Sequence, residues 1–416
     1  MSCLSFELNT NHLLFFLIFI IYYLRYYILF LSDYNEKEIQ VETLFFNIYI
    51  YQVSYFFSSI LFIIEKLRSK RKNKLKYLKG NVILKKKKTN KSLDLELIYE
   101  KINPVNTNLT FLRILIISLT DFSAQYFVFI FYIFFEVNKI ECDFILILSI
   151  LSKYLFSRLL LKTDYYKHHH LSILINILGL ILISVIDIKR LYDSWDLNTL
   201  YFILIKVFCT ICYSFEDVIG KIALIRDFLS PISIIFYKGI IEFILLLIGS
   251  IPFIFIPINN QNIFSTFISK FEQINNIYLI FLLMFFNFLY NLLIWLINDK
   301  FSPNHLAMAM IIEGITLKIN YFVFNFEQFK ENLYISIYEA SIYFILIIGV
   351  MIHSEILILN CCGLNEYTIK NLKIKSEEDF EYANKKSSDT SFNNEDSRET
   401  KAIPENTELS IIIPTD

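Results

Sequence analysis

The sequence predicts an all-α polytopic membrane protein in which ten transmembrane helices form a 5+5 inverted repeat. Three observations predict this class. Hydrophobic residues make up 55% of the 416 residues, and the mean hydropathy is +0.50, whereas soluble domains are about 45–50% apolar. The apolar residues are gathered into ten separate runs, and the fifth and tenth runs share a short pattern.

Each run is long enough to cross a hydrocarbon core of about 30 Å, which takes about 20 residues of helix. Backbone groups inside lipid must bond to one another, so these runs are expected to be helices. The first run follows Glu7 and has no basic n-region or small-residue cleavage site, so we expect it to be retained. The predicted spans are 13–31, 43–64, 109–135, 142–161, 171–188, 198–219, 231–257, 277–297, 303–324 and 338–359.

The pattern shared by the fifth and tenth runs is a glycine followed five residues later by a serine. Gly179 precedes Ser184, and Gly349 precedes Ser354. If each half contains five spans, the second half must insert upside-down relative to the first, as in the inverted repeats of secondary transporters. The halves are predicted to be 1–188 and 198–360, and the Gly-to-Ser match is interpreted as packing at the end of each half.

Loop charge predicts the orientation. The net charge is −1, but about 19 Lys and Arg residues fall in the loops after the second, fourth, sixth and eighth runs, against about 6 in the alternate loops. The positive-inside rule then places both termini in the cytosol. The basic loop 65–108 is expected to meet anionic lipid head groups. The tail 364–416 is expected to be acidic, disordered and cytosolic.

Several kinds of chemistry lack their sequence signals. The chain has no Gly-x-x-x-x-Gly-Lys-Ser/Thr loop and only 8 glycines, so direct ATP-driven pumping is not expected. It has no Arg-rich voltage-sensor helix and no filter-like Gly-Tyr-Gly loop, which disfavours a channel. Gly-x-Ser-x-Gly and HExxH are also absent. The sequence predicts a protein that is not an enzyme and holds no cofactor and no metal.

Histidine and cysteine clusters leave alternatives open. The run from His168 to His170 could bind metal or act as a base, but an interfacial, structural role is favoured. Cys209 and Cys212 have CxxC spacing inside an apolar run without a second pair, which favours packing over a redox or zinc site. Cys361 and Cys362 are either lipidated or two inert thiols.

Polar side chains inside the predicted spans should face a cavity or a partner, because they are costly in lipid. Ser118, Asp121 and Gln125 fall on one helix face. Asn287 and Asn291 have the same period in the corresponding helix of the second half, so the two stripes predict a shared midplane cavity.

Two carboxylates near the middle of their spans are the candidates for proton coupling or substrate contact. Asp121 lies about halfway along the third span, and Glu313 lies about halfway along the ninth, with Thr316 and Asn320 on its face. The alternative is that each carboxyl group is a neutral, hydrogen-bonded packing residue.

A second charged group is predicted at the cytosolic mouth. Glu216 and Asp217 end the sixth span, and Lys238 and Glu242 are spaced i to i+4 in the seventh. Lys238 either pairs with Glu242 on its own helix or meets Glu216 or Asp217 to form a gate. Lys153 and Arg158 of the fourth span are expected to snorkel toward the surface and face lipid.

Parts of the chain resemble the drug/metabolite transporter superfamily, and within it solute carrier family 35, the nucleotide-sugar-transporter-like group, particularly its F-type members. The similar segments are Leu151 to Lys162, His168 to Leu171, the helix around Gly179, Glu216-Asp217-Val218, Leu229-Ser230-Pro231 and Lys238-Gly239-Ile240. The resemblance covers about 109–360.

This resemblance implies a ten-helix fold with a central cavity that opens alternately to each side. It implies exchange, facilitated or proton-coupled transport in a Golgi, endoplasmic reticulum or vacuolar membrane. No basic residue is predicted to lie in the cavity and hold a diphosphate, so nucleotide-sugar transport is disfavoured. The acidic candidates favour a cationic or proton-coupled solute.

The leading expectation is therefore a secondary transporter of a small metabolite or drug-like solute. Its expected partners are membrane lipid, that solute and a second copy of the chain as a homodimer, and no nucleic acid. One alternative is a polytopic membrane enzyme that acts on lipid with His169 or a neighbour as base. The other is a non-transporting adaptor that recruits partners through 65–108 and 364–416.

Overall fold

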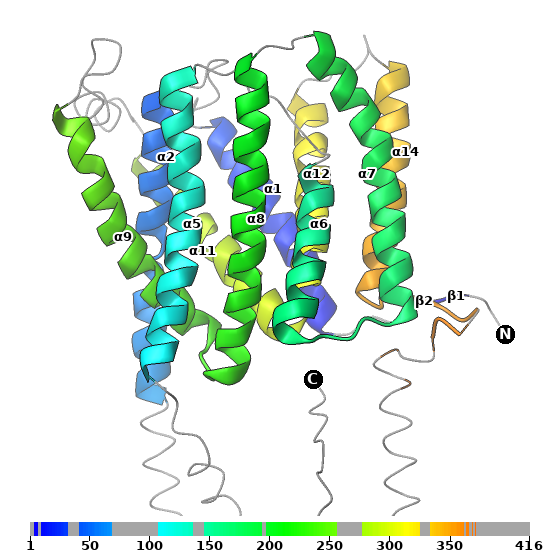
Figure 1. The fold of residues 1–416 in the computed structure, drawn as a ribbon, viewed down its shortest axis with the longest axis horizontal. Helices are drawn as coiled ribbons and strands as arrows, with labels where there is room; N and C mark the ends of the chain where they lie inside the picture. The colour runs from blue at the N-terminus through cyan, green and yellow to red at the C-terminus, as the bar shows by residue number, and fades with distance from the viewer. Residues whose placement is uncertain are drawn as a thin grey trace, which may run out of the picture.

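The fold is described from a computed structural model, which describes residues 4–6, 10–31, 41–68, 107–135, 145–193, 197–255, 277–324, 333–361, 363–365, 368 and 371. The basic segment 69–106, Cys362 and nearly all of the tail after 365 lie outside these residues, as do most of the loops used to predict orientation. Within the described residues the protein is almost entirely helical, and its helices stand side by side (Figure 1).

A helix occupies each of the ten predicted runs. The helices are α1 (Leu13–Leu31), α2 (Val41–Ser54), α5 (Thr107–Phe135), α6 (Ile145–Phe156), α7 (Lys167–Asp193), α8 (Leu197–Arg226), α9 (Pro231–Phe255), α11 (Ile277–Lys300), α12 (Pro303–Phe324) and α14 (Leu333–His353). The short 3₁₀ helix η1 (Thr10–His12) precedes α1, and the π-helical turn η2 (Ser157–Leu161) continues α6.

Six of these helical segments are long and apolar enough to cross a membrane. They are Ile48–Arg68, Asn108–Ile130, Lys167–Ile186, Pro231–Pro252, Tyr278–Lys300 and Tyr334–His353. The protein is therefore a multi-pass, membrane-embedded α-helical protein. Helices α1, α6, α8 and α12 carry charged residues such as Arg25, Lys153, Glu216 and Glu313 within their runs.

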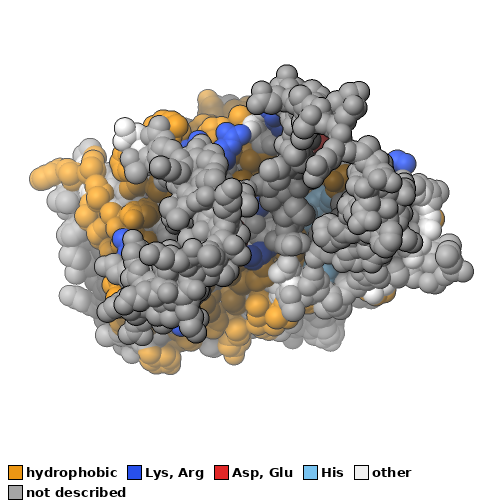
Figure 2. Space-filling model, turned by 90° about the horizontal axis from the view of Figure 1, so that it is seen from below, with side chains coloured by type: hydrophobic (Ala, Val, Ile, Leu, Met, Phe, Trp, Pro, Cys, Tyr) orange, Lys and Arg blue, Asp and Glu red, His pale blue; other side chains and the backbone are white. Residues whose placement is uncertain are grey.

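The outer surface of the bundle is apolar. On α7, the exposed side chains include Leu174, Leu178, Ile181 and Val185. Seen from below, hydrophobic side chains also gather along the left and lower edges of the molecule (Figure 2). A soluble protein seldom exposes so much contiguous apolar surface. Lipid chains therefore replace water as the solvent of this face.

Serine and proline begin α9, at the start of the predicted span 231–257. The Ser230 hydroxyl accepts a hydrogen bond from the backbone N–H of Ser233 at 3.1 Å, and Pro231 is the first helical residue. Proline is suited to this position because its missing N–H would have no partner within the helix. Pro303 is likewise the first residue of α12.

Helix α2 is interrupted at Tyr55 and Phe56. The backbone N–H of Tyr55 bonds to Gln52 O at 3.2 Å, a tighter i to i−3 pattern, and a further helical segment follows over 57–68. Gly239 of α9 faces this break, where an added Cβ would collide with Tyr55. The close approach of the two backbones brings α9 and the break in α2 together in the interior.

Helices α7 and α14 form a closely packed antiparallel pair (Figure 1). A Cβ added at Gly179 would lie 2.6 Å from Leu346 Cδ2, and a Cβ added at Gly349 would lie 2.6 Å from Asn176 Oδ1. Ser172 also donates a 2.7 Å hydrogen bond to the Gly349 carbonyl. Both glycines permit this approach because they lack a side chain.

The last predicted span, 338–359, is partly wrong. Helix α14 ends at His353, and Glu355 follows with φ of 58°. Leu357–Leu359 form strand β2, which pairs antiparallel with β1 (Leu4–Phe6). The left-handed backbone at Glu355 ends the helix. The strand pairing places the chain before α1 and the chain after α14 on the same side of the bundle.

Candidate functional site

A cavity of about 370 Å³ lies inside the bundle. Its lining comes from α1, α2, α5, α6, α8, α9, α11 and α12. Its charged residues are three cations and three carboxylates, and its other polar residues are amides and tyrosines. They are Arg25, Lys153, Lys238, Asp121, Glu216, Asp217, Gln125, Asn291, Tyr51, Tyr213 and Tyr290. Trp295 and Met310 contribute to the apolar part.

Lys238 is the centre of the charge network. Its side chain is buried and forms ion pairs with Asp121 of α5, with Glu216 of α8 at 2.6 Å, and with Glu242 at 3.7 Å. Its ammonium group also lies 5.9 Å from the ring centroid of Trp295. One lysine thus faces three buried carboxylates from three helices.

This network combines two groups that the sequence treated separately. The predicted contact between Lys238 and Glu216 is present, and so is the helical pairing with Glu242. Asp121, predicted as a coupling residue rather than a gate residue, joins the same lysine. Asp217 does not, because it pairs with another cation.

That cation is Lys153 of α6, whose expected lipid-facing position is wrong. Its side chain is only 1% exposed, and its Nζ lies 2.7 Å from Asp217 Oδ2 and 3.3 Å from Met310 Sδ. Arg158, five residues later, is exposed as expected. Lys153 turns inward because a buried carboxylate stabilises its charge there, whereas lipid offers no such partner.

Asp121 is also held by an amide chain. Gln125 Nε2 donates to Asp121 Oδ1 at 2.8 Å, and Gln52 Nε2 donates to Gln125 Oε1 at 3.4 Å. Ser118, on the same predicted face, is buried but donates to Ile114 O of its own helix at 2.9 Å. The α5 stripe therefore splits into two cavity residues and one packing residue.

The matching stripe on α11 splits in the same way. Asn291 lines the cavity and accepts a 2.8 Å hydrogen bond from the Tyr51 hydroxyl. Asn287 is buried, and its backbone carbonyl accepts a 2.9 Å hydrogen bond from Asn291 Nδ2. The two predicted stripes thus reach one cavity through Asp121, Gln125 and Asn291.

Glu313 lies behind the cavity wall. The Tyr290 hydroxyl, which belongs to the lining, donates to Glu313 Oε1 at 2.6 Å. The Arg25 guanidinium lies 5.3 Å from the centroid of the same ring. Glu313 is therefore connected to the cavity through Tyr290. Thr316, predicted to lie on the same face as Glu313, donates to Ile312 O.

The cavity contains three basic residues, although none was predicted there to hold a diphosphate. Arg25, Lys153 and Lys238 all line it. Lys153 and Lys238 are paired with carboxylates, while Arg25 makes no ion pair among the residues that the structure describes. Arg25 could have been found from the sequence as the single charge within the first apolar run, because an ionisable residue inside a membrane span is a functional candidate.

Cys209 of the pair in α8 packs against α5. Its side chain is buried, and its thiol contacts the Ala124 carbonyl at 3.3 Å. Cys209 and Cys212 are both free thiols.

No protein-family model matches the chain, and no curated protein matches it either.

Proposed function

We propose that the protein is a secondary transporter that moves a small metabolite or drug-like solute across an endomembrane by alternating access. The observation that carries the proposal is the cavity between the helices, with its central buried lysine and the three carboxylates that this lysine faces. Charged side chains inside a membrane protein are costly and are retained where a solute or ion pathway needs them.

A 5+5 inverted repeat is supported by which helices touch. With α1 to α7 as the first half and α8 to α14 as the second, α5 packs on α8 as α11 packs on α1. Likewise α6 packs on α8 as α12 packs on α1, and α5 packs on α9 as α11 packs on α2. Such paired contacts are expected when two halves are related by a pseudo-twofold axis.

The repeat suggests how access would alternate. Lys238 belongs to the second half and Asp121 to the first, so their ion pair joins the two halves across the cavity. Breaking this pair and the contact between Lys153 and Asp217 would allow one half to rock against the other. These two pairs are the proposed gate.

The charges suggest a cationic or proton-coupled solute. Asp121, Glu216 and Glu242 surround the one positive charge of Lys238. A proton or a cationic group of the solute would neutralise a carboxylate and release the lysine. The volume of the cavity falls within the range of about 300–1,000 Å³ that is typical of small-molecule sites.

The proposed setting follows from loop charge and from the segments similar to solute carrier family 35. Both termini would be cytosolic, and the membrane would be that of the Golgi, endoplasmic reticulum or vacuole. The pairing of β1 with β2 supports termini on a common side.

The experiment is uptake of a metabolite panel into proteoliposomes, with and without a pH gradient. We expect at least one solute to accumulate, and Asp121→Asn and Glu313→Gln to lower its uptake at least about tenfold. Asp227→Asn is the matched control, because Asp227 pairs with Arg113 outside the cavity. Lack of uptake of every solute by a folded, monodisperse sample would overturn the proposal.

A further inference from the structure

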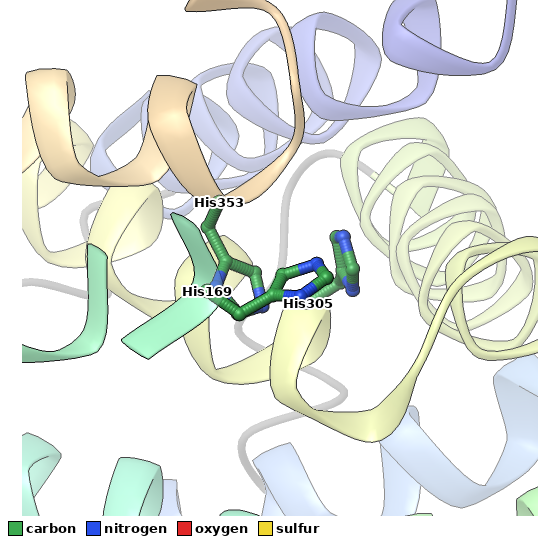
Figure 3. Close-up of side chains that lie close together, drawn as sticks. All are labelled: His169, His305 and His353. Carbon is green, nitrogen blue, oxygen red and sulfur yellow. The ribbon is translucent and has the colours of Figure 1, made fainter. Parts of the chain in front are cut away.

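Three histidines far apart in the sequence meet at one end of the bundle. His169 lies near the start of α7, His305 near the start of α12, and His353 is the last residue of α14 (Figure 3). Histidine side chains are visible on the lower face of the molecule in Figure 2. The cluster is separate from the charged cavity, whose lining includes none of the three.

The three imidazoles are close enough to share one ion. The ring centroid of His353 lies 4.5 Å from that of His305 and 4.9 Å from that of His169. One nitrogen from each of the three rings lies within 4.8 Å of the others. A tetrahedral ion with Zn–N distances of about 2.0–2.1 Å needs nitrogens roughly 3.3 Å apart, so the rings would move closer together on binding it.

His353 is buried without any hydrogen bond. Its side chain is 0% exposed, and neither ring nitrogen has a hydrogen-bond partner among the described residues. A neutral imidazole carries one N–H donor and one lone pair, and burying both without partners is unfavourable. A metal ion at the centre of the cluster would accept the lone pair.

The other two histidines could each supply a ring nitrogen. His305 Nδ1 lies 2.9 Å from the Ser302 hydroxyl oxygen and accepts a 3.3 Å hydrogen bond from the Ser302 backbone N–H. Ligation through Nε2 would require Nδ1 to carry the proton and to donate it to the hydroxyl oxygen, at the cost of the bond from the backbone N–H. His169 Nδ1 accepts a long 3.3 Å hydrogen bond from the Tyr166 backbone N–H. Ligation by His169 would therefore replace or reorient one weak hydrogen bond.

His168 and the carboxylate of Glu355 lie beside the three-histidine cluster. The ring of His168 lies 4.0 Å from that of His169, and His168 Nε2 lies 3.2 Å from Glu355 Oε1, outside hydrogen-bonding geometry. Together His168, His169 and Glu355 form a second group of close donor atoms.

The backbone at Glu355 adds to this observation. Glu355 has φ of 58°, a left-handed conformation that favours glycine. A carboxylate at this position, rather than a glycine, is consistent with a need for its side chain beside the histidines.

We propose that His169, His305 and His353 bind one divalent transition-metal ion of the zinc class, with His168 or Glu355 completing the coordination. Imidazole nitrogen is a preferred ligand of zinc, and a three-histidine site with a fourth ligand gives the tetrahedral arrangement that zinc adopts. The ion would join the ends of three helices. This proposal concerns a metal site only and stands apart from transport.

The test adds Zn²⁺ to the purified, metal-stripped protein and measures metal content after desalting, together with the thermal unfolding temperature. The wild-type chain is expected to retain about one zinc ion and to unfold at a higher temperature with zinc, because a ligand that binds only the folded state stabilises it. His353→Gln should weaken zinc binding more than about tenfold, and zinc should no longer raise its unfolding temperature.

His170→Gln is the matched control. His170 belongs to the same histidine run but is exposed and lies outside both donor groups. It should bind zinc like the wild type. Equal zinc retention by wild type and His353→Gln, or retention by neither, would overturn the proposal.

A measurement on the wild-type chain keeps the test valid if His353→Gln fails to fold. Co²⁺ substituted into the wild type and into His170→Gln should give the intense visible absorption of a tetrahedral nitrogen-ligated site. An absorption spectrum like that of hydrated, octahedral Co²⁺ would overturn the proposal independently of any variant.

Discussion

Gly179 and Gly349 make reciprocal contacts across the α7–α14 pair. Gly179 packs against Leu346, three residues before Gly349, and Gly349 packs against Asn176, three residues before Gly179. The serines that follow them are also equivalent, because Ser184 donates to Leu180 O and Ser354 donates to Val350 O. The short match between the fifth and tenth runs thus corresponds to a self-complementary helix contact.

This contact predicts that Gly349→Ala is destabilising. The added methyl group would meet Asn176 Oδ1, Cγ and Nδ2 at 2.6–2.7 Å, and overpacking of this kind costs about 1–3 kcal/mol. Thermal unfolding in detergent measures the effect. Gly314→Ala is the control, because its nearest contact would be 3.8 Å away, and we expect it to be neutral or slightly stabilising. Equal unfolding temperatures for the two variants would contradict the proposed packing.

The central lysine predicts strong coupling between charges. Lys238→Met leaves Asp121, Glu216 and Glu242 without their shared cation. Removing one partner of a buried ion pair typically costs about 3–5 kcal/mol. The double variant Lys238→Met, Asp121→Asn should recover part of this loss, since it removes one of the stranded negative charges. Additive losses in the free energy of unfolding would mean that the two residues do not interact.

The two cations of the α6 segment should behave differently. Lys153 is buried against Asp217, whereas Arg158 of η2 is exposed. Lys153→Met should lower the free energy of unfolding by about 3 kcal/mol or more, and Arg158→Met should change it by less than about 0.5 kcal/mol. Chemical denaturation in mixed micelles would measure the free energy of unfolding of both variants. A larger effect at Arg158 would restore the lipid-facing interpretation of Lys153.

Cys361 offers a test of the proposed orientation. It is exposed and lies two residues after the end of β2. In a variant that keeps Cys361 and replaces the other five cysteines by serine, a membrane-impermeant maleimide added to sealed, cytosol-side-out vesicles should label the protein. Labelling only after permeabilisation would place this end of the chain on the opposite side.

Much of the fold follows from local sequence. The ten apolar runs each became a helix because a backbone in lipid, or buried among apolar helices, must form its hydrogen bonds within the segment. The helix starts at Pro231 and Pro303 also have a local cause, because a proline at the first helical position loses no hydrogen bond. The exception is the end of the last run, where Leu357–Leu359 pair with Leu4–Phe6, a partner more than 350 residues away.

The candidate site was only partly predictable. Helical periodicity put Asp121 and Gln125 on one face, and the charges of Glu216 and Lys238 made their pairing a reasonable expectation. Periodicity cannot tell a lysine that reaches lipid head groups from one that reaches a buried carboxylate, so Lys153 was assigned to the wrong environment. Arg25 was missed because its partners, the rings of Tyr22 and Tyr290, carry no charge.

By itself, then, the sequence determined the membrane-embedded helical class, the positions of the helices and some of the residues that avoid lipid, such as Asp121 and Glu216. Only the tertiary structure decided which of these residues meet. Lys238 reaches Asp121 and Glu216 from other helices, and His353 reaches His169 and His305. The physical reason is that helix formation depends on neighbours within a few residues, whereas burying a charge or an imidazole depends on partners that only packing of distant helices supplies.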